Sequence, residues 1–211
     1  MMSKDKPLTE VNLVLSIKLV ATISLLIPAT PSKSESGTDE LSAAQGLPAV
    51  TQANRVLMAR EAYAKWQAQS GKSIILDVRT PEEFLFVGHA EMAWNVPVAA
   101  QSYIWDSATG QFPMRPLPDF VSRVEQIAKH SDTLLVMCRS GGRSALAVEL
   151  LTRAGFSNVY NISDGMEGDL VTDTNSVFRG QRMVNGWKNS GLPWTYDVDP
   201  KRMVLPPNPG Q

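Results

Sequence analysis

The feature that most constrains the fold is a short apolar segment that leads through a glycine- and arginine-containing loop into an amphipathic helix. Residues 134–137 form a continuous apolar run, which is typical of a strand buried on both faces. The run ends at Cys138, the only cysteine of the chain. From Ser144 onward apolar residues recur with helical spacing, and Gly155 stands where a helix commonly ends. The segment therefore predicts a strand–loop–helix unit with one thiol at its turn.

A thiol at this turn lies between the carboxyl end of a strand and the amino end of a helix. Unpaired backbone N–H groups and the positive end of the helix dipole favour a negative charge there. Arg139 and Arg143 add positive charge to the same loop. A free cysteine often serves as a small buried hydrophobe, but a packed core has no use for the two arginines and two glycines that follow. We therefore predict that Cys138 is a nucleophilic thiolate in an anion-binding loop.

Three motifs resemble the rhodanese (sulfurtransferase) family and occur in its order over about residues 51–195. The loop 138–144 is similar to the family's active-site loop. The segment 76–84, with the following Gly88-His89 and Asn95-Val96-Pro97, resembles its other signature segment, and 186–194 resembles its C-terminal end. The resemblance implies an α/β, rhodanese-like three-layer fold with a central, mostly parallel sheet and helices on both faces. The alternation of predicted strands and helices independently favours that architecture.

The resemblance also assigns the site. It implies that Cys138 is the catalytic residue and that the remaining loop residues bind the anionic substrate: Arg139, Ser140, Gly141, Gly142, Arg143 and Ser144. Asp77 and Arg79 follow a second apolar run, at the strand end where open α/β sheets build sites. We expect them to be supporting residues joined by a salt bridge rather than participants in the chemistry.

The other elements follow from local signals. Helical spacing predicts helices over 55–69 and 117–130, and apolar runs predict strands over 73–78, 93–96 and 158–162. Thr80, Pro81 and Glu83 form a predicted helix start with a capping box. The long segment 98–118 is predicted as a loop that either borders the substrate entrance or packs its own aromatic residues. Residues 169–184 depart from the family pattern as an inserted loop near the site, which is either a solvated excursion or selects substrate or partner.

The composition excludes several classes of function. A net charge of −1 offers no basic field for nucleic acid. One cysteine excludes an internal disulfide, and with only two histidines a dedicated zinc site is not expected. We find no internal repeat, which argues against a tandem of two such domains. The proposed chemistry needs no metal and no organic cofactor.

The N-terminal region resembles a targeting segment. Residues 1–31 have a basic start, an apolar centre and a small-residue end, which predicts a signal peptide, while an N-terminal membrane anchor is the alternative. We favour export, and hence a periplasmic protein, because Lys18 would place a charge inside a rather short span. Residues 32–50 are predicted to be a flexible linker, 51–196 the rhodanese-like domain and 197–211 an extended tail.

The predicted activity is transfer of sulfane sulfur from thiosulfate or a similar donor, through a Cys138 persulfide, to cyanide, a thiol or a protein thiol. One alternative is a persulfide carrier without turnover, or a partner-binding rhodanese-like module. Another is a cysteine-dependent phosphatase or arsenate reductase. The active-site loops of those enzymes carry five residues between the cysteine and the arginine. Here four residues separate Cys138 from Arg143, and this tighter loop favours sulfur transfer over phosphate chemistry.

Overall fold

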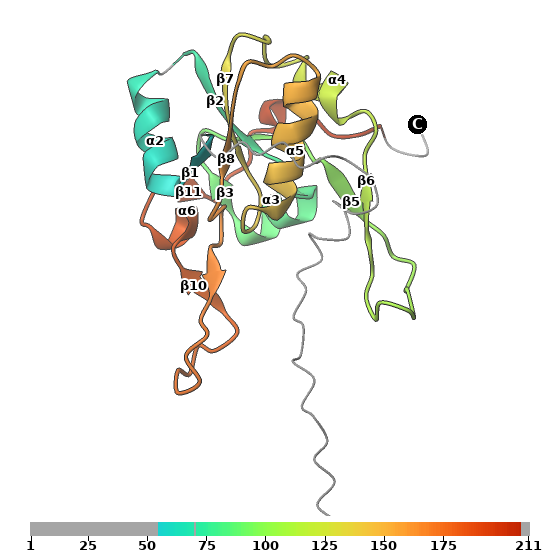
Figure 1. Cartoon of the computed structure of the whole chain (residues 1–211), viewed down its shortest axis with the longest axis vertical. Helices are drawn as coiled ribbons and strands as arrows, with labels where there is room; N and C mark the ends of the chain where they lie inside the picture. The colour runs from blue at the N-terminus through green and yellow to red at the C-terminus, as the bar shows by residue number, and fades with distance from the viewer. Residues whose placement is uncertain (1–54, 70, 208–211) are drawn as a thin grey trace, which may run out of the picture. The chain divides into compact units, whose positions relative to one another are not determined.

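A computed structural model of the chain describes residues 55–69 and 71–207 (Figure 1). The predicted signal peptide or anchor and the predicted linker lie outside these residues. Within them, no helix combines the length and the apolar character needed to cross a membrane.

The centre of the domain is a five-stranded sheet in which every pairing is parallel. Its order is β1 (Val56–Leu57), β8 (Asn158–Ile162), β7 (Thr133–Met137), β2 (Ser73–Asp77) and β4 (Trp94–Asn95). The predicted α/β fold with a parallel sheet is thus confirmed. Strands β2 and β7 pair so that Asp77 lies opposite Met137. The segments after both strands therefore emerge side by side, which brings Arg79 and Cys138 to the same edge.

Both faces of the sheet are covered by other elements. Successive side chains of β7 point to opposite faces and therefore pack in two different cores. Leu134 and Val136 pack with Ala147 and Leu151 of α5 (Gly142–Arg153) and with α4 (Phe120–Val124). Leu135 and Met137 pack in the second core with α2 (Ala59–Ala68), Phe84 of α3 (Pro81–Val87) and Trp187 of α6 (Gly186–Asn189). The uninterrupted apolar run at 134–137 is the sequence signature of this two-sided burial.

Two predicted helices are shorter than expected. The helix predicted over 55–69 begins only at Ala59, because Val56 and Leu57 pair with Asn161 and Ile162 as strand β1. The helix predicted over 117–130 is limited to α4. Beyond it the N–H groups of Gln126 and Ile127 donate to carbonyls three residues back, which is the tighter 3₁₀ pattern.

Two hairpins project from the domain (Figure 1). The segment predicted as a loop at 98–118 contains the antiparallel strands β5 (Ala99–Gln101) and β6 (Met114–Pro116). Its aromatic residues Trp105 and Phe112 contact each other edge to face, so it packs its own aromatic residues. The inserted segment at 169–184 is a ribbon of β9 (Asp169–Leu170) and β10 (Arg182–Val184).

The C-terminal part of the domain adds small elements. Strand β3 (His89–Ala90) pairs antiparallel with β11 (Trp194–Thr195), and a short 3₁₀ helix, η1 (Pro200–Arg202), follows. The segment predicted as an extended tail is bound to the domain as far as Val204, whose N–H donates to the carbonyl of Asn95.

Candidate active site

Cys138 lies at the turn between β7 and α5, where the sequence predicted it. Its Sγ accepts a hydrogen bond from the N–H of Gly141 at 3.2 Å. The hydroxyl of Ser144 lies 3.4 Å from the sulfur and shares its proton between Sγ and the carbonyl of Gly141, which is 3.0 Å away. The residue is 1% exposed. Although Cys138 borders the apolar core, its sulfur therefore faces two hydrogen-bond donors at the leading end of α5. Donors of this kind favour a negatively charged sulfur.

Two glycines make the tight loop possible. Gly141 has φ +97°, and a Cβ there would collide with the carbonyl oxygen of Ser163. Gly165 has φ +59°, and a Cβ at this position would come within 2.5 Å of the carbonyl oxygen of Cys138. Both positions combine left-handed backbone with contacts that only glycine tolerates.

The segment after Gly165 holds the loop from outside. The N–H of Met166 donates to the carbonyl of Cys138 at 2.8 Å, and the N–H of Glu167 donates to that of Arg139 at 3.0 Å. The sequence predicted no role in the site for residues 165–167. The one available signal was the pair of glycines at 165 and 168, which marks a turn without naming its partner.

Arg143 is joined to α3 by an ion pair. Its guanidinium makes two hydrogen bonds of 2.6 Å to the carboxylate of Glu83, while its predicted role in anion binding stays a prediction. Burial alone would raise the pKa of Glu83, but the hydrogen bonds and charge of Arg143 outweigh burial and lower it. Glu83 also completes the predicted capping box with Thr80, which is confirmed.

Asp77 and Arg79 form the predicted salt bridge. Both side chains are fully buried, and Nη2 of Arg79 lies 2.7 Å from Oδ2 of Asp77. The same nitrogen donates to the carbonyl of Gly88 at 2.8 Å. Burial works against the charge of Arg79, yet Asp77 raises its pKa above the ordinary value. The pair ties the segment after β2 to the start of the next strand, and its supporting role in the site stays a prediction.

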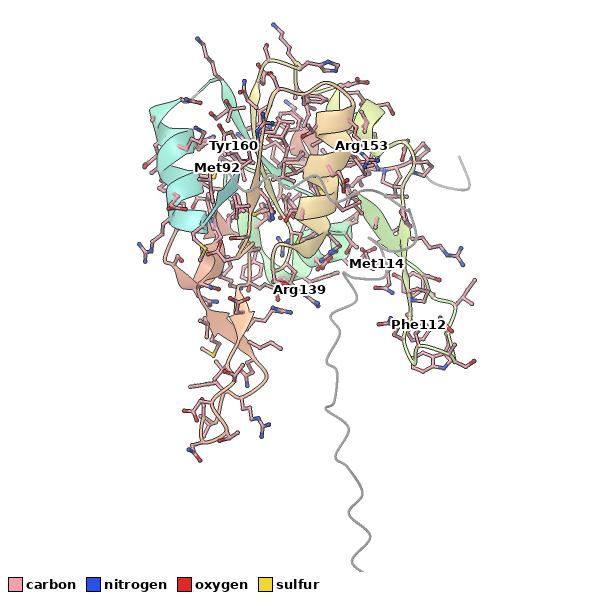
Figure 2. All side chains as sticks on the ribbon, in the orientation of Figure 1. Met92, Phe112, Met114, Arg139, Arg153 and Tyr160 are labelled. Atoms are coloured by element: carbon pink, nitrogen blue, oxygen red, sulfur yellow. The ribbon has the colours of Figure 1, made fainter. Side chains whose placement is uncertain are left out.

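Arg139 and Ser140 are the outer residues of the loop. Arg139 is exposed, and Figure 2 shows it at the end of the molecule from which the hairpins project. Its guanidinium makes no hydrogen bond or ion pair within the ranges 55–69 and 71–207. Ser140 is half-buried. Arg139 is therefore the loop arginine whose charge is available to an anion.

Sequence reasoning missed Arg182, which belongs to β10 of the inserted ribbon. Its Nη1 donates to the carbonyl of Gly168 at 2.6 Å. Burial and the positive charge of Arg139 lower the pKa of Arg182, whereas Glu167, Asp169 and Cys138 oppose that effect. The inserted segment thus contributes a cation near the site. The prediction that it lies near the site agrees with this placement.

No group of three or more histidine, cysteine, aspartate or glutamate side chains suited to a metal ion is present among the residues placed by the structure. His89, near the second motif, is buried and stacks on Phe84, and its Nδ1 lies 3.1 Å from the carbonyl of Phe84. Burial lowers the pKa of His89. These contacts give it a structural place in the domain.

A parallel α/β domain whose single thiol lies at a strand–helix turn, beside a backbone amide and a hydroxyl, defines a class of α/β proteins with a cysteine at the loop between a central strand and a helix. Within it the family is clear: residues 59–169 match the model of the rhodanese-like domain, and the chain belongs to that family. The crystal structure of Rv0390 from M. tuberculosis superimposes with a TM-score of 0.52 at 26% identity, over 67% of this chain and 97% of that one.

Two plant relatives are named for an activity. The chloroplastic thiosulfate sulfurtransferase 16 of Arabidopsis thaliana is 46% identical over 90 residues, which cover 43% of this chain and 68% of that protein. Thiosulfate sulfurtransferase 18 of the same plant is 33% identical over 121 residues, 57% of this chain and 83% of that protein. Family and relatives together support a sulfurtransferase-type function for this chain.

Proposed function

We propose that the protein is a thiosulfate sulfurtransferase that works through a persulfide on Cys138. The observation that carries the proposal is the sulfur itself, which accepts a hydrogen bond from the N–H of Gly141 and lies beside the hydroxyl of Ser144 inside a loop fixed by Gly165. The names of the two plant relatives support the choice of thiosulfate as donor.

In the first step the Cys138 thiolate attacks the outer sulfur of thiosulfate. A bond forms between Sγ and that sulfur, while the sulfur–sulfur bond of the donor breaks and its electron pair leaves with sulfite. The charges balance, because a monoanionic thiolate and a dianionic donor give a monoanionic persulfide and dianionic sulfite. In the second step a thiophilic acceptor such as cyanide takes the outer sulfur and regenerates the thiolate. This is covalent catalysis with ping-pong kinetics.

The residues of the loop stabilise charge without taking up protons. The N–H of Gly141 and the hydroxyl of Ser144 are aimed at the sulfur before reaction, as in an oxyanion hole. Arg139 supplies positive charge for binding thiosulfate. Glu83 holds the side chain of Arg143 in place at the first turn of α5. The spacing of four residues between Cys138 and Arg143 favours sulfur transfer over the phosphatase or arsenate reductase alternative, whose loops carry five.

Steady-state kinetics test the proposal. With thiosulfate as donor and cyanide as acceptor, we expect the protein to form thiocyanate with parallel double-reciprocal plots, and we expect the Cys138→Ser variant to form none. Because Cys138 is the only cysteine, this variant removes every thiol. Turnover by Cys138→Ser at the wild-type rate would contradict the proposal. Transfer of a single sulfur without repeated turnover would favour the carrier alternative.

We also propose that the protein is exported to the periplasm, either free or attached to the membrane. Export would be carried by residues 1–31, and cell fractionation with an antibody against the domain tests it. We expect the protein in the periplasmic or membrane fraction, and its presence only among cytosolic proteins would contradict export.

A further inference from the structure

Four arginines surround the turn that carries Cys138, and two of them are neutralised. Arg79 is bound by Asp77 and Arg143 by Glu83. The other two, Arg139 and Arg182, form no ion pair with any carboxylate in the part of the chain that the structure describes. The free positive charge of the site therefore resides in one loop arginine and one arginine of the inserted ribbon.

Two hydrogen bonds connect Arg182 to the loop that carries Cys138, one from the backbone and one from the Arg182 guanidinium. Glu167 donates its N–H to the carbonyl of Arg139, and the next residue, Gly168, accepts a hydrogen bond of 2.6 Å from Arg182 Nη1. Arg182 also pairs with Leu170 across the ribbon. In Figure 1 the ribbon leaves the domain at the end where α5 begins, and Figure 2 shows Arg139 at that same end.

The two guanidinium groups act on each other. Arg182 is half-buried; burial and the positive charge of Arg139 lower its pKa, whereas the negative charges of Glu167, Asp169 and Cys138 raise it. Because Glu167 and Asp169 form no ion pair with Arg182 and offset the repulsion from Arg139 only in part, an anion bound between the two guanidinium groups relieves the rest. Guanidinium groups bind oxyanions through several charge-assisted hydrogen bonds, and binding a divalent anion gains more from two cations than binding a monovalent one.

We propose that Arg182 is a specificity-determining residue that, together with Arg139, binds the sulfonate oxygens of a dianionic sulfur donor. The inference rests on the proposed function, and it gives the inserted ribbon a role in choosing the donor by charge. Thiosulfate carries two negative charges. The methanethiosulfonate anion presents the same kind of terminal sulfur but carries only one negative charge. The ratio of kcat/KM for these two donors therefore reports on Arg182.

The first experiment compares Arg182→Gln with Arg179→Gln. Arg179 lies exposed on the same ribbon, so both variants remove one positive charge from it. With cyanide as acceptor, we expect Arg182→Gln to lower kcat/KM for thiosulfate about tenfold, the size typical for one charge-assisted hydrogen bond, and to lower it only about twofold for methanethiosulfonate. Arg179→Gln should leave the ratio unchanged, and Arg182→Lys should restore part of it. Equal losses for both donors, or the same shift in Arg179→Gln, would overturn the inference.

A second experiment needs no turnover and separates the two proposals. Sulfate, an unreactive dianion, should protect Cys138 against alkylation by neutral iodoacetamide. We expect Arg182→Gln to need about tenfold more sulfate than wild type and Arg179→Gln to need the same amount. If wild type transferred no sulfur, the proposed function would fail while this assay still decided on Arg182. Equal protection in all three proteins, or no protection of wild type, would overturn the inference. Equal alkylation rates without sulfate show that the variants keep the fold of the site.

Discussion

Both carboxylate oxygens of Glu83 accept hydrogen bonds of 2.6 Å from the guanidinium of Arg143. The two partners lie 60 positions apart in the chain. The same carboxylate caps the start of α3, so one side chain fixes that helix and the first turn of α5. The thiol loop is therefore joined to α3 by this ion pair, in addition to the backbone hydrogen bonds from the segment after Gly165.

Replacement of Glu83 by glutamine tests this connection. We expect Glu83→Gln to lower the free energy of unfolding by about 2 kcal/mol, because Arg143 loses a charged hydrogen-bond partner. Glu82→Gln, on the exposed neighbouring residue of the same helix, should change it by less than about 0.5 kcal/mol. Denaturant unfolding at neutral pH measures both. Equal stability of the two variants would show that the ion pair contributes nothing.

The same pair predicts a pH dependence. The folded protein lowers the pKa of Glu83 below its ordinary value of 4.5, so the unfolded chain binds the proton first as the pH falls. The stability that ionised Glu83 provides is fully present above that value and is lost as the pH falls through the lowered pKa. The difference in unfolding free energy between wild type and Glu83→Gln should therefore be constant near neutral pH and shrink below about pH 4.5. A difference that grows in acid would contradict the lowered pKa.

Substitution of Gly141 tests the loop geometry. Alanine at this position needs left-handed backbone and also collides with the carbonyl of Ser163. Gly180, at the ribbon, has φ +80°, and a Cβ there would meet no atom within 4 Å, so Gly180→Ala isolates the backbone strain. We expect Gly180→Ala to cost about 1–2 kcal/mol of stability with sulfur transfer retained. Gly141→Ala should be less stable still and inactive, and an active Gly141→Ala would mean that the cradle is not needed.

Neutralisation of Asp77 tests its supporting role. Asp77→Asn removes the closer charge partner of the buried guanidinium of Arg79 and leaves only Glu167, 3.8 Å away, which should cost about 3 kcal/mol. Glu149→Gln breaks the exposed pair with Arg153 on α5 and should cost less than about 1 kcal/mol. If Asp77 only supports the fold, the folded fraction of Asp77→Asn should keep its KM for thiosulfate. A large rise of that KM would assign Asp77 to the donor site.

The sequence predicted the parts of the site that depend on local signals. The apolar run before Cys138, the glycines of the loop and the helical spacing after Ser144 lie within one segment, and each signal has one physical interpretation. The same holds for the capping box at Thr80. The salt bridge between Asp77 and Arg79 was also within reach, because only one residue separates them.

The contacts that the sequence did not predict join residues far apart in the chain. Strand β1 contains only Val56 and Leu57, which in isolation fit the helical pattern that follows, and its pairing with β8 overrides that pattern. The capping box already accounts for a glutamate at position 83, so the sequence gives no reason to expect an ion pair between Glu83 and Arg143. Arg182 lies in an insertion without a motif, and only the folded ribbon brings it near the thiol.

The most direct test of the persulfide mechanism is mass spectrometry of the reduced protein after a single exposure to thiosulfate. We predict a gain of one sulfur atom, located on the peptide that contains Cys138, release of one equivalent of sulfite, and loss of the added sulfur as thiocyanate when cyanide is supplied. An unchanged mass of the Cys138 peptide while thiosulfate is consumed would contradict the mechanism.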